Sequence, residues 1–549
     1  MSDNKLKTPS DLANENQQKA SDPCFSVWVE ASAGTGKTKV LSDRVLRLLL
    51  SGVNPSKILC LTYTKAAAVE MNSRVADRLS KWAVASDAEL EKELFSLFGQ
   101  TPGNSTEFSA LKARARQLFA TLLDVPGGIK IQTIHSFCQE ILKRFPLEAG
   151  ISPYFNVMDD RNAIEAINEV KAKLFQTAGA NPDSKLAQAI DYLTFHVNES
   201  GFSDIINSII INRGKIDRVI KKYGGIEGLI SAIADKLAIN DAFSEEQIVH
   251  NFFADMPLEN LRRLTSAGME ALCPWTDGQN SGSVDYNSYA HLFLTSENKI
   301  RSPSKLAFLK KDPALKQIFD DEANRCLDLF QKLKSLKIFL STKAVLQIAS
   351  RLLDGYNEFK QKHAQLDYND MILLTRNLLE NKEAARWVLF KLDGGIDNIL
   401  IDEAQDTSPD QWAIIQSISD EFFAGLGSSE NTRTVCAVGD RKQSIYSFQG
   451  ADPDKFDEMR NHFDALTPDF KKINLEVSFR SAPAILEAVN QLFKDNNVSK
   501  GVASSGETIH HRAFREGEGG EVEFWEMIEP DETKEKDDLH LPIEHISEI

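Results

Sequence analysis

One eight-residue motif near the N-terminus constrains the fold of this chain more than any other feature. The motif is Ala31-Ser32-Ala33-Gly34-Thr35-Gly36-Lys37-Thr38. It matches the pattern G-x-x-x-x-G-K-[ST], except that Ala31 replaces the first glycine. An apolar run at residues 25–30 precedes the motif, and residues 37–50 have helical periodicity. A glycine-rich turn between a strand and a helix predicts an α/β domain whose turn binds phosphate.

The residue types of this turn suit a nucleotide. Gly34 and Gly36 allow the backbone to curl, so that its N–H groups point at phosphate oxygens. Lys37 can reach the β- and γ-phosphates, and the Thr38 hydroxyl can ligate Mg²⁺. We therefore expect all eight residues to bind ATP, with Lys37 also acting in catalysis.

A second apolar run ends in a pair of acids. Residues 399–401 are Ile-Leu-Ile, and Asp402 and Glu403 follow them directly. Ligands of parallel sheets bind at the carboxyl ends of the strands, which would bring this pair beside the phosphate loop. We expect Asp402 to hold Mg²⁺ through water. Glu403 is expected to act as the general base toward the attacking water.

The order of the expected elements indicates one α/β domain with a long insertion. Strand signals occur at residues 25–30, 57–62, 129–132, 396–401, 434–438 and 473–477. Helical signals separate the first three, which predicts a parallel sheet covered on both faces. Between residues 160 and 380 the chain has mostly long amphipathic helical stretches. The insertion explains why the acid pair lies so far along the chain from Lys37.

Charge and composition limit the classes of function that this chain can have. The formal net charge is −17, but residues 501–549 hold 14 acidic and 4 basic residues. This acidity argues against nucleic-acid binding through bulk positive charge, though not against a local groove with aromatic stacking. No run of about 18 apolar residues is present, so no transmembrane helix is expected. The six scattered cysteines form no CxxC pair, which suits a reducing cytoplasm.

Several further motifs occur in the order found in one family. They are Gln17 with Ala20, residues 31–38, residues 61–71, residues 132–138, residues 366–371, residues 399–408, residues 438–452 and residues 475–481. Together they resemble the superfamily 1A helicases of the UvrD/Rep type. The residues of these motifs are most similar to those of the AddA/RecB branch, which includes the AddA subunit of the bacterial AddAB double-strand-break repair enzymes.

The resemblance implies a division of the chain into parts. A flexible segment with the Q motif would occupy residues 1–22. A RecA-like ATPase lobe would follow at residues 23–155 and resume at 366–470, on either side of a helical insertion at 156–365. Residues 471–549 would begin a second RecA-like lobe and end in an acidic tail.

The resemblance also implies roles for residues outside the phosphate loop. Gln17 would hydrogen-bond the adenine edge, and Phe479 would stack on the adenine face. Gln443 would sense the γ-phosphate. Arg480 would approach from the second lobe as an arginine finger, which stabilises charge in the transition state.

A third set of residues would contact DNA. The family stacks bases on aromatic side chains in the motifs that here contain Tyr63, Tyr446 and Phe448, and stacking tolerates any sequence because every base has a π-face. Thr62 lies beside Tyr63 in the same motif. Thr133 and His135 match the motif that contacts the DNA backbone.

We therefore expect an ATP- and Mg²⁺-dependent 3′→5′ helicase of double-strand-break repair that binds single-stranded or duplex-end DNA. A second subunit resembling AddB, a nucleoid-associated cytoplasmic location and the absence of membrane contact are implied as well. The family's motifs V and VI and its nuclease domain do not occur in these 549 residues. The chain then corresponds to the N-terminal part of a longer protein, and alone it is expected to bind ATP with weak or no hydrolysis.

Two other classes compete with this interpretation. A P-loop kinase or switch NTPase would have no use for the aromatic residues at 446 and 448 or for the Phe479-Arg480 pair. An ATP-gated DNA-binding or scaffold subunit without unwinding activity stays open, because the second lobe is only begun.

Overall fold

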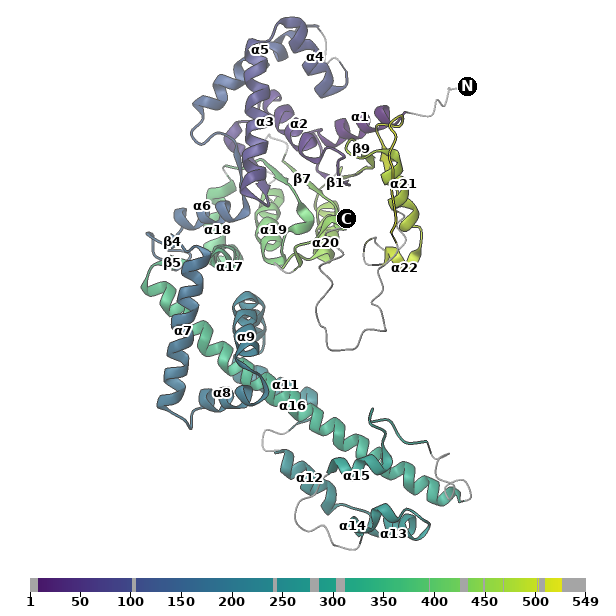
Figure 1. The fold of residues 1–549 in the computed structure, drawn as a ribbon. Helices are drawn as coiled ribbons and strands as arrows, with labels where there is room; N and C mark the ends of the chain where they lie inside the picture. Colours follow the sequence, from purple (N-terminus) through teal and green to yellow (C-terminus); the bar gives the residue numbers. More distant parts are fainter. Residues whose placement is uncertain are drawn as a thin grey trace, which may run out of the picture. The chain divides into compact units, whose positions relative to one another are not determined.

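In the described part of the chain, six short strands form one parallel sheet (Figure 1). They are β1 (Val27–Ala31), β2 (Ile58–Thr62), β3 (Lys130–Thr133), β6 (Asn398–Ile401), β7 (Thr434–Gly439) and β8 (Lys471–Leu475). Their order across the sheet is β3-β2-β6-β7-β1-β8. Strands β2, β6 and β7 are buried along their whole length, as expected for a sheet with helices on both faces. The α/β fold with a parallel sheet is therefore confirmed.

The register of the sheet brings the strand ends together. Ile401, the last residue of β6, pairs with Leu61 of β2 and Ala437 of β7. Glu30 of β1 pairs with Gly439, the last residue of β7. Because all these strands run in one direction, the residues that follow β1, β6 and β7 emerge at the same edge of the sheet.

The computed structural model describes residues 8–100, 105–239, 244–276, 286–302, 312–393, 395–424, 433–447, 450–467, 469–500, 502 and 509–525. The chain divides into two compact units. The first, here called the sheet unit, comprises Met1–Pro153 and Tyr368–Ile549. The second, the helical unit, comprises Tyr154–Asp367, where the sequence predicted an insertion at 156–365.

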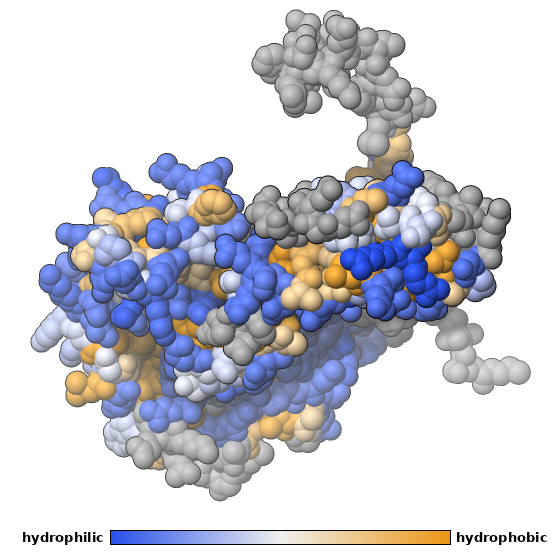
Figure 2. All heavy atoms as spheres, turned by 90° about the horizontal axis from the view of Figure 1, so that it is seen from below, coloured by the Kyte–Doolittle hydropathy of each residue, from blue (hydrophilic) through white to orange (hydrophobic). Residues whose placement is uncertain are grey.

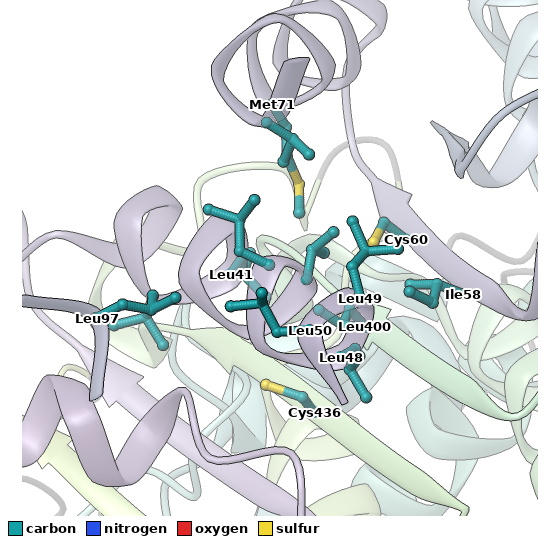
Figure 3. Packing of buried hydrophobic residues seen from close by; sticks show 14 of the residues in the cluster. Leu41, Leu48, Leu49, Leu50, Ile58, Cys60, Met71, Leu97, Leu400 and Cys436 are labelled. Carbon is teal, nitrogen blue, oxygen red and sulfur yellow. The ribbon is translucent and has the colours of Figure 1, made fainter. Parts of the chain in front are cut away.

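Both faces of the sheet are covered by helices of the sheet unit. The helices of this unit are α1 (Pro9–Ala20), α2 (Lys37–Leu50), α3 (Lys65–Val84), α4 (Asp87–Phe98), α5 (Ser105–Asp124), α6 (Ile134–Arg144), α17 (Tyr368–Glu380), α18 (Lys382–Asp393), α19 (Pro409–Ala424), α20 (Pro453–Leu466), α21 (Pro483–Leu492) and α22 (Asn496–Ser499). Figure 3 shows Leu41 and Leu49 of α2 among residues of the sheet, with Met71 of α3 close by. On the opposite face, Trp28 of β1 packs against Trp412 of α19, with ring centroids 6.0 Å apart.

The N-terminal segment differs from the expectation of a flexible tail. Residues 9–20 form α1, which begins after a Thr8 cap. The Thr8 hydroxyl accepts a hydrogen bond from the Asp11 backbone, and the Asp11 carboxylate accepts one from the Thr8 backbone in return. This capping box and the burial of Ala13, Gln17 and Ala20 order a sequence that is polar in composition.

The expected start of a second lobe at residue 471 is wrong for β8. This strand pairs in parallel with β1 and forms an edge of the first sheet. Ile473 and Leu475 are buried in the same core as β1 and α2, and this burial explains the pairing. The next strand, β9 (Val477–Ser478), pairs separately with β10 (Arg512–Ala513).

A single helix of 50 residues, α16 (Pro313–Lys362), organises the helical unit. The other helices are α7 (Asp160–Ala180), α8 (Lys185–His196), α9 (Glu199–Ile211), α10 (Arg213–Lys222), α11 (Ile226–Leu237), α12 (Glu245–Ala254), α13 (Leu258–Ser266), α14 (Cys273–Thr276) and α15 (Tyr286–Phe293). Strands β4 (Asn156–Val157) and β5 (Gln365–Leu366) pair where the chain enters and leaves the unit. Residues of α16 contribute to three separate apolar clusters, so different stretches of one helix serve different neighbours.

Figure 2 shows one face on which hydrophilic residues predominate and hydrophobic residues gather in separate patches. Within the described ranges, no helix is both long enough and apolar enough to cross a membrane.

Candidate nucleotide and DNA site

The turn after β1 has the conformation that its glycines predict. Gly34 and Gly36 have φ angles of 77° and 92°, and α2 begins at Lys37. Gly34 is also a point of close approach, because a Cβ there would come within 2.6 Å of the Arg480 Cβ. The Gly34 carbonyl accepts a hydrogen bond of 2.8 Å from the Phe479 N–H. Residues 478–480 therefore lie directly against the phosphate loop.

Lys37 meets residues from two other strand ends. Its Nζ donates to Glu403 Oε2 at 2.9 Å and to Gln443 Oε1 at 3.4 Å. These three residues follow β1, β6 and β7, so the parallel sheet brings together side chains that are hundreds of positions apart in the sequence. The structure thus assembles three of the five residues predicted to be catalytic.

The acid pair occupies a partly buried turn at the end of β6. Burial raises the pKa of Asp402 to about 6, and the neighbouring Glu403 carboxylate adds to this effect. Lys37 and the Glu403 N–H oppose the shift without cancelling it. Glu403 has a φ of 49°, which is unusual for a residue with a side chain and is a form of backbone strain often found at functional sites.

The metal-binding potential of the site is limited to oxygen donors. Among the described residues, no group of three or more His, Cys, Asp and Glu side chains could hold a metal ion. The Thr38 hydroxyl and the Asp402 carboxylate are the donors predicted for Mg²⁺, and Mg²⁺ favours such oxygens while keeping water and phosphate in its other positions. A carboxylate whose ionised form is disfavoured by its surroundings is suited to a cation, so these residues fit the group.

Beside the phosphate loop lies a pocket of about 320 Å³. It is lined by Asn14, Gln17, Gln18, Ser21, Gly34, Gly36, Lys39, Asp43, Ser96, Leu97 and Phe479. Gln17 Nε2 donates to the Thr35 carbonyl at 3.0 Å, and Gln17 Oε1 accepts from Lys39 Nζ at 2.9 Å. The predicted adenine-binding residues Gln17 and Phe479 therefore share one pocket next to the phosphate loop.

Sequence reasoning missed several of the residues that line this pocket. Ser96 and Leu97 come from the end of α4, a helix for which the motifs gave no signal. Lys39 was also missed, although it follows the motif by one residue. The signal that could have indicated Lys39 is its helical spacing, because positions 39 and 43 lie on one face of α2, where the two side chains form an ion pair of 3.1 Å.

Phe479 and Arg480 follow β9 within the sheet unit. The Phe479 ring packs against Phe514 with centroids 4.6 Å apart, and the residue also lines the pocket. Arg480 is exposed, and its Cβ lies beside Gly34. Arg480 belongs to the same compact unit as the phosphate loop, to which hydrogen bonds of Ser478 and Phe479 attach this segment. Its role as an arginine finger stays a prediction.

Two of the aromatic residues predicted to contact DNA form a pair. The rings of Tyr63 and Tyr446 have centroids 4.8 Å apart and are tilted by 34°. Burial raises the pKa of Tyr63 to about 12, with a further contribution from Asp406, so its hydroxyl stays protonated at neutral pH. Phe448 lies outside the described residues.

The other predicted DNA residues have local structural contacts. Thr133 caps α6 by accepting a hydrogen bond of 3.2 Å from the Ser136 N–H, and Thr62 is buried with its hydroxyl on the Thr64 carbonyl. His135 packs edge-on against Tyr368, with centroids 5.8 Å apart. Burial, followed by the charge of Lys65, lowers the pKa of His135, so its ring is neutral at neutral pH.

Comparison with known proteins places this geometry in a family. Residues 12–464 match the UvrD/REP helicase N-terminal domain. The chain is 26% identical over 532 residues to the A subunit of the ATP-dependent helicase/nuclease of Lactobacillus acidophilus, covering 88% of this chain and 40% of the relative. It is 28% identical over 581 residues to the protein of the same name from Acetivibrio thermocellus, covering 93% and 42%.

The chain thus spans about two fifths of the length of these relatives. Helicases are enzymes that use a nucleotide and bind DNA, in keeping with the phosphate loop and the acid pair at one sheet edge. Because the family match covers most of the sequence, this chain belongs to the UvrD/REP helicase family.

Proposed function

We propose that the protein containing this chain is an ATP-dependent DNA helicase of double-strand-break repair that moves 3′→5′ along single-stranded DNA. The chain supplies the lobe that binds ATP. The observation that carries the proposal is the convergence of Lys37, Glu403 and Gln443 at one edge of the parallel sheet. A loop for phosphate, a base for water and a polar sensor are the parts that nucleotide hydrolysis requires.

Each residue has a role in this proposal. Lys37 binds the β- and γ-phosphates. Glu403 takes the proton from the attacking water, and Gln443 contacts the γ-phosphate through its amide. Arg480 stabilises the negative charge that builds on the transferring phosphoryl group.

Two further sets of contacts complete the nucleotide site. Gln17 and Phe479 hold the adenine in the pocket of about 320 Å³. Thr38 and Asp402 hold Mg²⁺, Asp402 through water. When bound, the ion neutralises charge on the phosphates.

The DNA site is proposed at the Tyr63–Tyr446 pair. Exposed aromatic faces bind bases of any sequence, and both residues are only partly buried. Thr133 and His135 at the start of α6 are proposed to contact the DNA backbone. Such a site suits an acidic chain, because stacking contributes affinity that does not depend on positive charge.

A second polypeptide belongs to the proposal as well. The relatives are named as one subunit of an ATP-dependent helicase/nuclease, which indicates that they assemble with another chain. We propose a partner resembling AddB for the protein that contains this sequence.

The proposal is tested by separating nucleotide binding from hydrolysis. In the protein that contains this chain, Lys37→Ala is expected to weaken binding of a fluorescent ATP analogue by about tenfold to a hundredfold, because it loses a charge-assisted contact. Glu403→Gln is expected to keep binding and to lower DNA-stimulated hydrolysis by about 10²–10⁴-fold, because it removes the base.

Lys57→Ala is the matched control. Lys57 also pairs with a carboxylate, that of Asp397 at 2.8 Å, but it precedes β2 at the opposite end of the sheet. This variant should keep both binding and turnover. Wild-type hydrolysis in Glu403→Gln or Lys37→Ala would contradict the assigned roles. Binding of ATP and DNA by the wild-type protein without any hydrolysis would favour an ATP-gated DNA-binding or scaffold subunit instead.

A further inference from the structure

The side-chain amide of Gln405 makes hydrogen bonds through both its nitrogen and its oxygen. Its Nε2 donates to Glu403 Oε2 at 2.8 Å and to Asp406 Oδ2 at 3.1 Å. Its Oε1 accepts from the Asp440 N–H at 2.9 Å. The residue is 1% exposed, so these partners hold it away from water. Such a fully used, buried amide has one orientation and fixes its partners relative to one another.

The backbone around Gln405 is arranged to admit the amide. A Cβ on Gly439 would come within 2.7 Å of Gln405 Oε1, so only glycine allows this approach at the end of β7. On the other side, Glu403 has the left-handed φ of 49°. The Gln405 donor and Lys37 Nζ both contact Glu403 Oε2, and together they hold this carboxylate in one position.

The same amide is attached to the segment after β7. Asp440, whose N–H it binds, accepts at its carboxylate from Gln443 Nε2 at 2.7 Å. The Ser444 hydroxyl donates to the backbone carbonyl of Gln405 at 3.3 Å. Tyr446 lies two residues further on and pairs with Tyr63. Hydrogen bonds therefore lead from the Glu403 carboxylate through Gln405 to the segment after β7, as far as Gln443 and Ser444. From there the chain itself continues to the aromatic pair at Tyr446.

We propose that Gln405 is a positioning residue that holds Glu403 for catalysis and couples the nucleotide site to the Tyr63–Tyr446 pair through residues 440–446. This inference rests on the proposed function and deepens it. A change at Glu403 or Lys37 alters the contacts of Gln405, and Gln405 in turn shifts the segment that ends at Tyr446. The reverse path lets DNA at the aromatic pair align Glu403, and binding energies between two such sites are reciprocal.

Two substitutions remove different parts of this contact set. Gln405→Met keeps the length of the side chain and loses both polar ends. Gln405→Glu keeps an oxygen for the Asp440 N–H and places a second oxygen against Glu403 and Asp406. Gln411→Met is the matched control, because Gln411 is also a buried glutamine with a backbone contact, at 3.0 Å to the Ser408 N–H.

The experiment measures three quantities in the protein that contains this chain. They are the Kd for a non-hydrolysable ATP analogue, the kcat for ATP hydrolysis, and the factor by which the analogue changes the Kd for a single-stranded oligonucleotide. For the wild type this factor is expected between about 5 and 150, the usual range of coupling between sites. Both Gln405 variants are expected to keep the analogue Kd within about threefold and to lower kcat by about tenfold to a hundredfold. Their coupling factor should fall toward one, and Gln411→Met should keep the wild-type factor.

Two results would overturn the inference. One is wild-type kcat and coupling in both Gln405 variants. The other is a loss of analogue binding in proportion to the loss of hydrolysis, which would indicate a structural role only. If Gln405→Met does not fold, as judged by its thermal unfolding, Gln405→Glu decides alone. A wild-type protein that fails to hydrolyse ATP contradicts the proposed function itself, and this outcome is distinct from a failure at Gln405.

Discussion

The two units of this chain place an aspartate in opposite electrostatic surroundings. In the helical unit, Asp367 accepts hydrogen bonds from Arg213 and, at 2.9 Å, from the Tyr356 hydroxyl, and Lys360 Nζ lies 3.9 Å from its Oδ2. In the sheet unit, burial and the Glu403 carboxylate raise the pKa of Asp402 to about 6. One carboxylate is surrounded by cations and a donor, and the other lies beside a second acid.

The different surroundings of the two carboxylates distinguish an acid that stabilises the fold from an acid that is suited to binding a cation. A buried charge is costly unless it is paired, so the partners of Asp367 stabilise the place where the chain leaves the helical unit. A carboxylate whose charge is disfavoured keeps its attraction for a cation that arrives with the substrate. The comparison predicts that removing the first acid destabilises its unit and that removing the second does the reverse.

The largest effect is expected at Asp367. Asp367→Ala leaves the buried Arg213 without this partner and should lower the free energy of unfolding of the helical unit by about 3–5 kcal/mol. Binding of an ATP analogue should stay unchanged in native buffer. Urea unfolding followed by circular dichroism measures the first quantity, and analogue fluorescence measures the second. Asp191→Ala, at an exposed position of α8, should change stability by less than about 0.5 kcal/mol. A loss below about 1 kcal/mol for Asp367→Ala would remove the distinction between the two acids.

Asp402→Asn is expected to raise the stability of the fold rather than lower it. The ordinary pKa of 3.8 applies to the unfolded chain, and the folded value is about 6. The folded protein therefore binds the proton more tightly, so ionised Asp402 destabilises the fold above about pH 6, and this cost disappears as the pH falls toward 4. Without divalent cations, the variant should be more stable than the wild type by about 2–3 kcal/mol above pH 6 and equal to it near pH 4.

Asp397→Asn is the control for this comparison of stability at different pH. Asp397 is buried and precedes β6, the strand that Asp402 follows, and it pairs with Lys57 at 2.8 Å. Its substitution should lower stability at neutral pH. If both variants lose stability above pH 6, the carboxylate of Asp402 is compensated in the fold and the contrast with Asp367 is wrong.

The sequence was most informative about residues that the parallel sheet brings together, because the carboxyl ends of parallel strands lie at one edge. Parallel strands end at one edge, so a phosphate loop after one strand and acids after another predicted that Lys37 and Glu403 would come together. Gln443 followed from the resemblance, and the structure brings it to Lys37 as well. The roles of these residues stay predictions until they are measured.

Other features depend on long-range packing that no local pattern encodes. The edge strand β8 joined the first sheet because Ile473 and Leu475 fit the core beside β1, a choice between two sheets that residues 471–475 alone do not determine. Leu97 of α4 lines the pocket beside the phosphate loop because of tertiary packing. In α16 the apolar face changes along the helix as its neighbours change, so no single periodicity describes the whole helix from Pro313 to Lys362.

Two glycines, one in each unit, allow the contrast between the sheet unit and the helical unit to be tested at the backbone. Gly34 and Gly224 have nearly equal φ angles of 77° and 73°, but a Cβ would meet Arg480 only at Gly34, whereas nothing lies within 4 Å of it at Gly224. Gly34→Ala is expected to weaken binding of the ATP analogue by about tenfold to a hundredfold, because strain and the clash both displace the loop. Gly224→Ala should cost about 1 kcal/mol of stability in the helical unit and leave binding unchanged. Equal binding in both variants would show that the close packing of residues 478–480 does not matter for the nucleotide.

The last comparison concerns a partly buried aromatic residue of the proposed DNA site and an exposed one in the helical unit. Tyr446→Ala should weaken binding of a single-stranded oligonucleotide by about 1–3 kcal/mol, which is the usual contribution of one stacked base. Phe195 of α8 is 87% exposed in the helical unit, so Phe195→Ala removes a more exposed ring and tests whether exposure alone suffices. It should leave affinity unchanged, because Phe195 lies outside the motifs predicted to contact DNA, whereas Tyr446 pairs with Tyr63. Fluorescence anisotropy with a labelled oligonucleotide measures both variants. If Phe195→Ala weakens binding as much as Tyr446→Ala does, DNA contacts extend to the helical unit, and the assignment of stability to one unit and chemistry to the other is too strict.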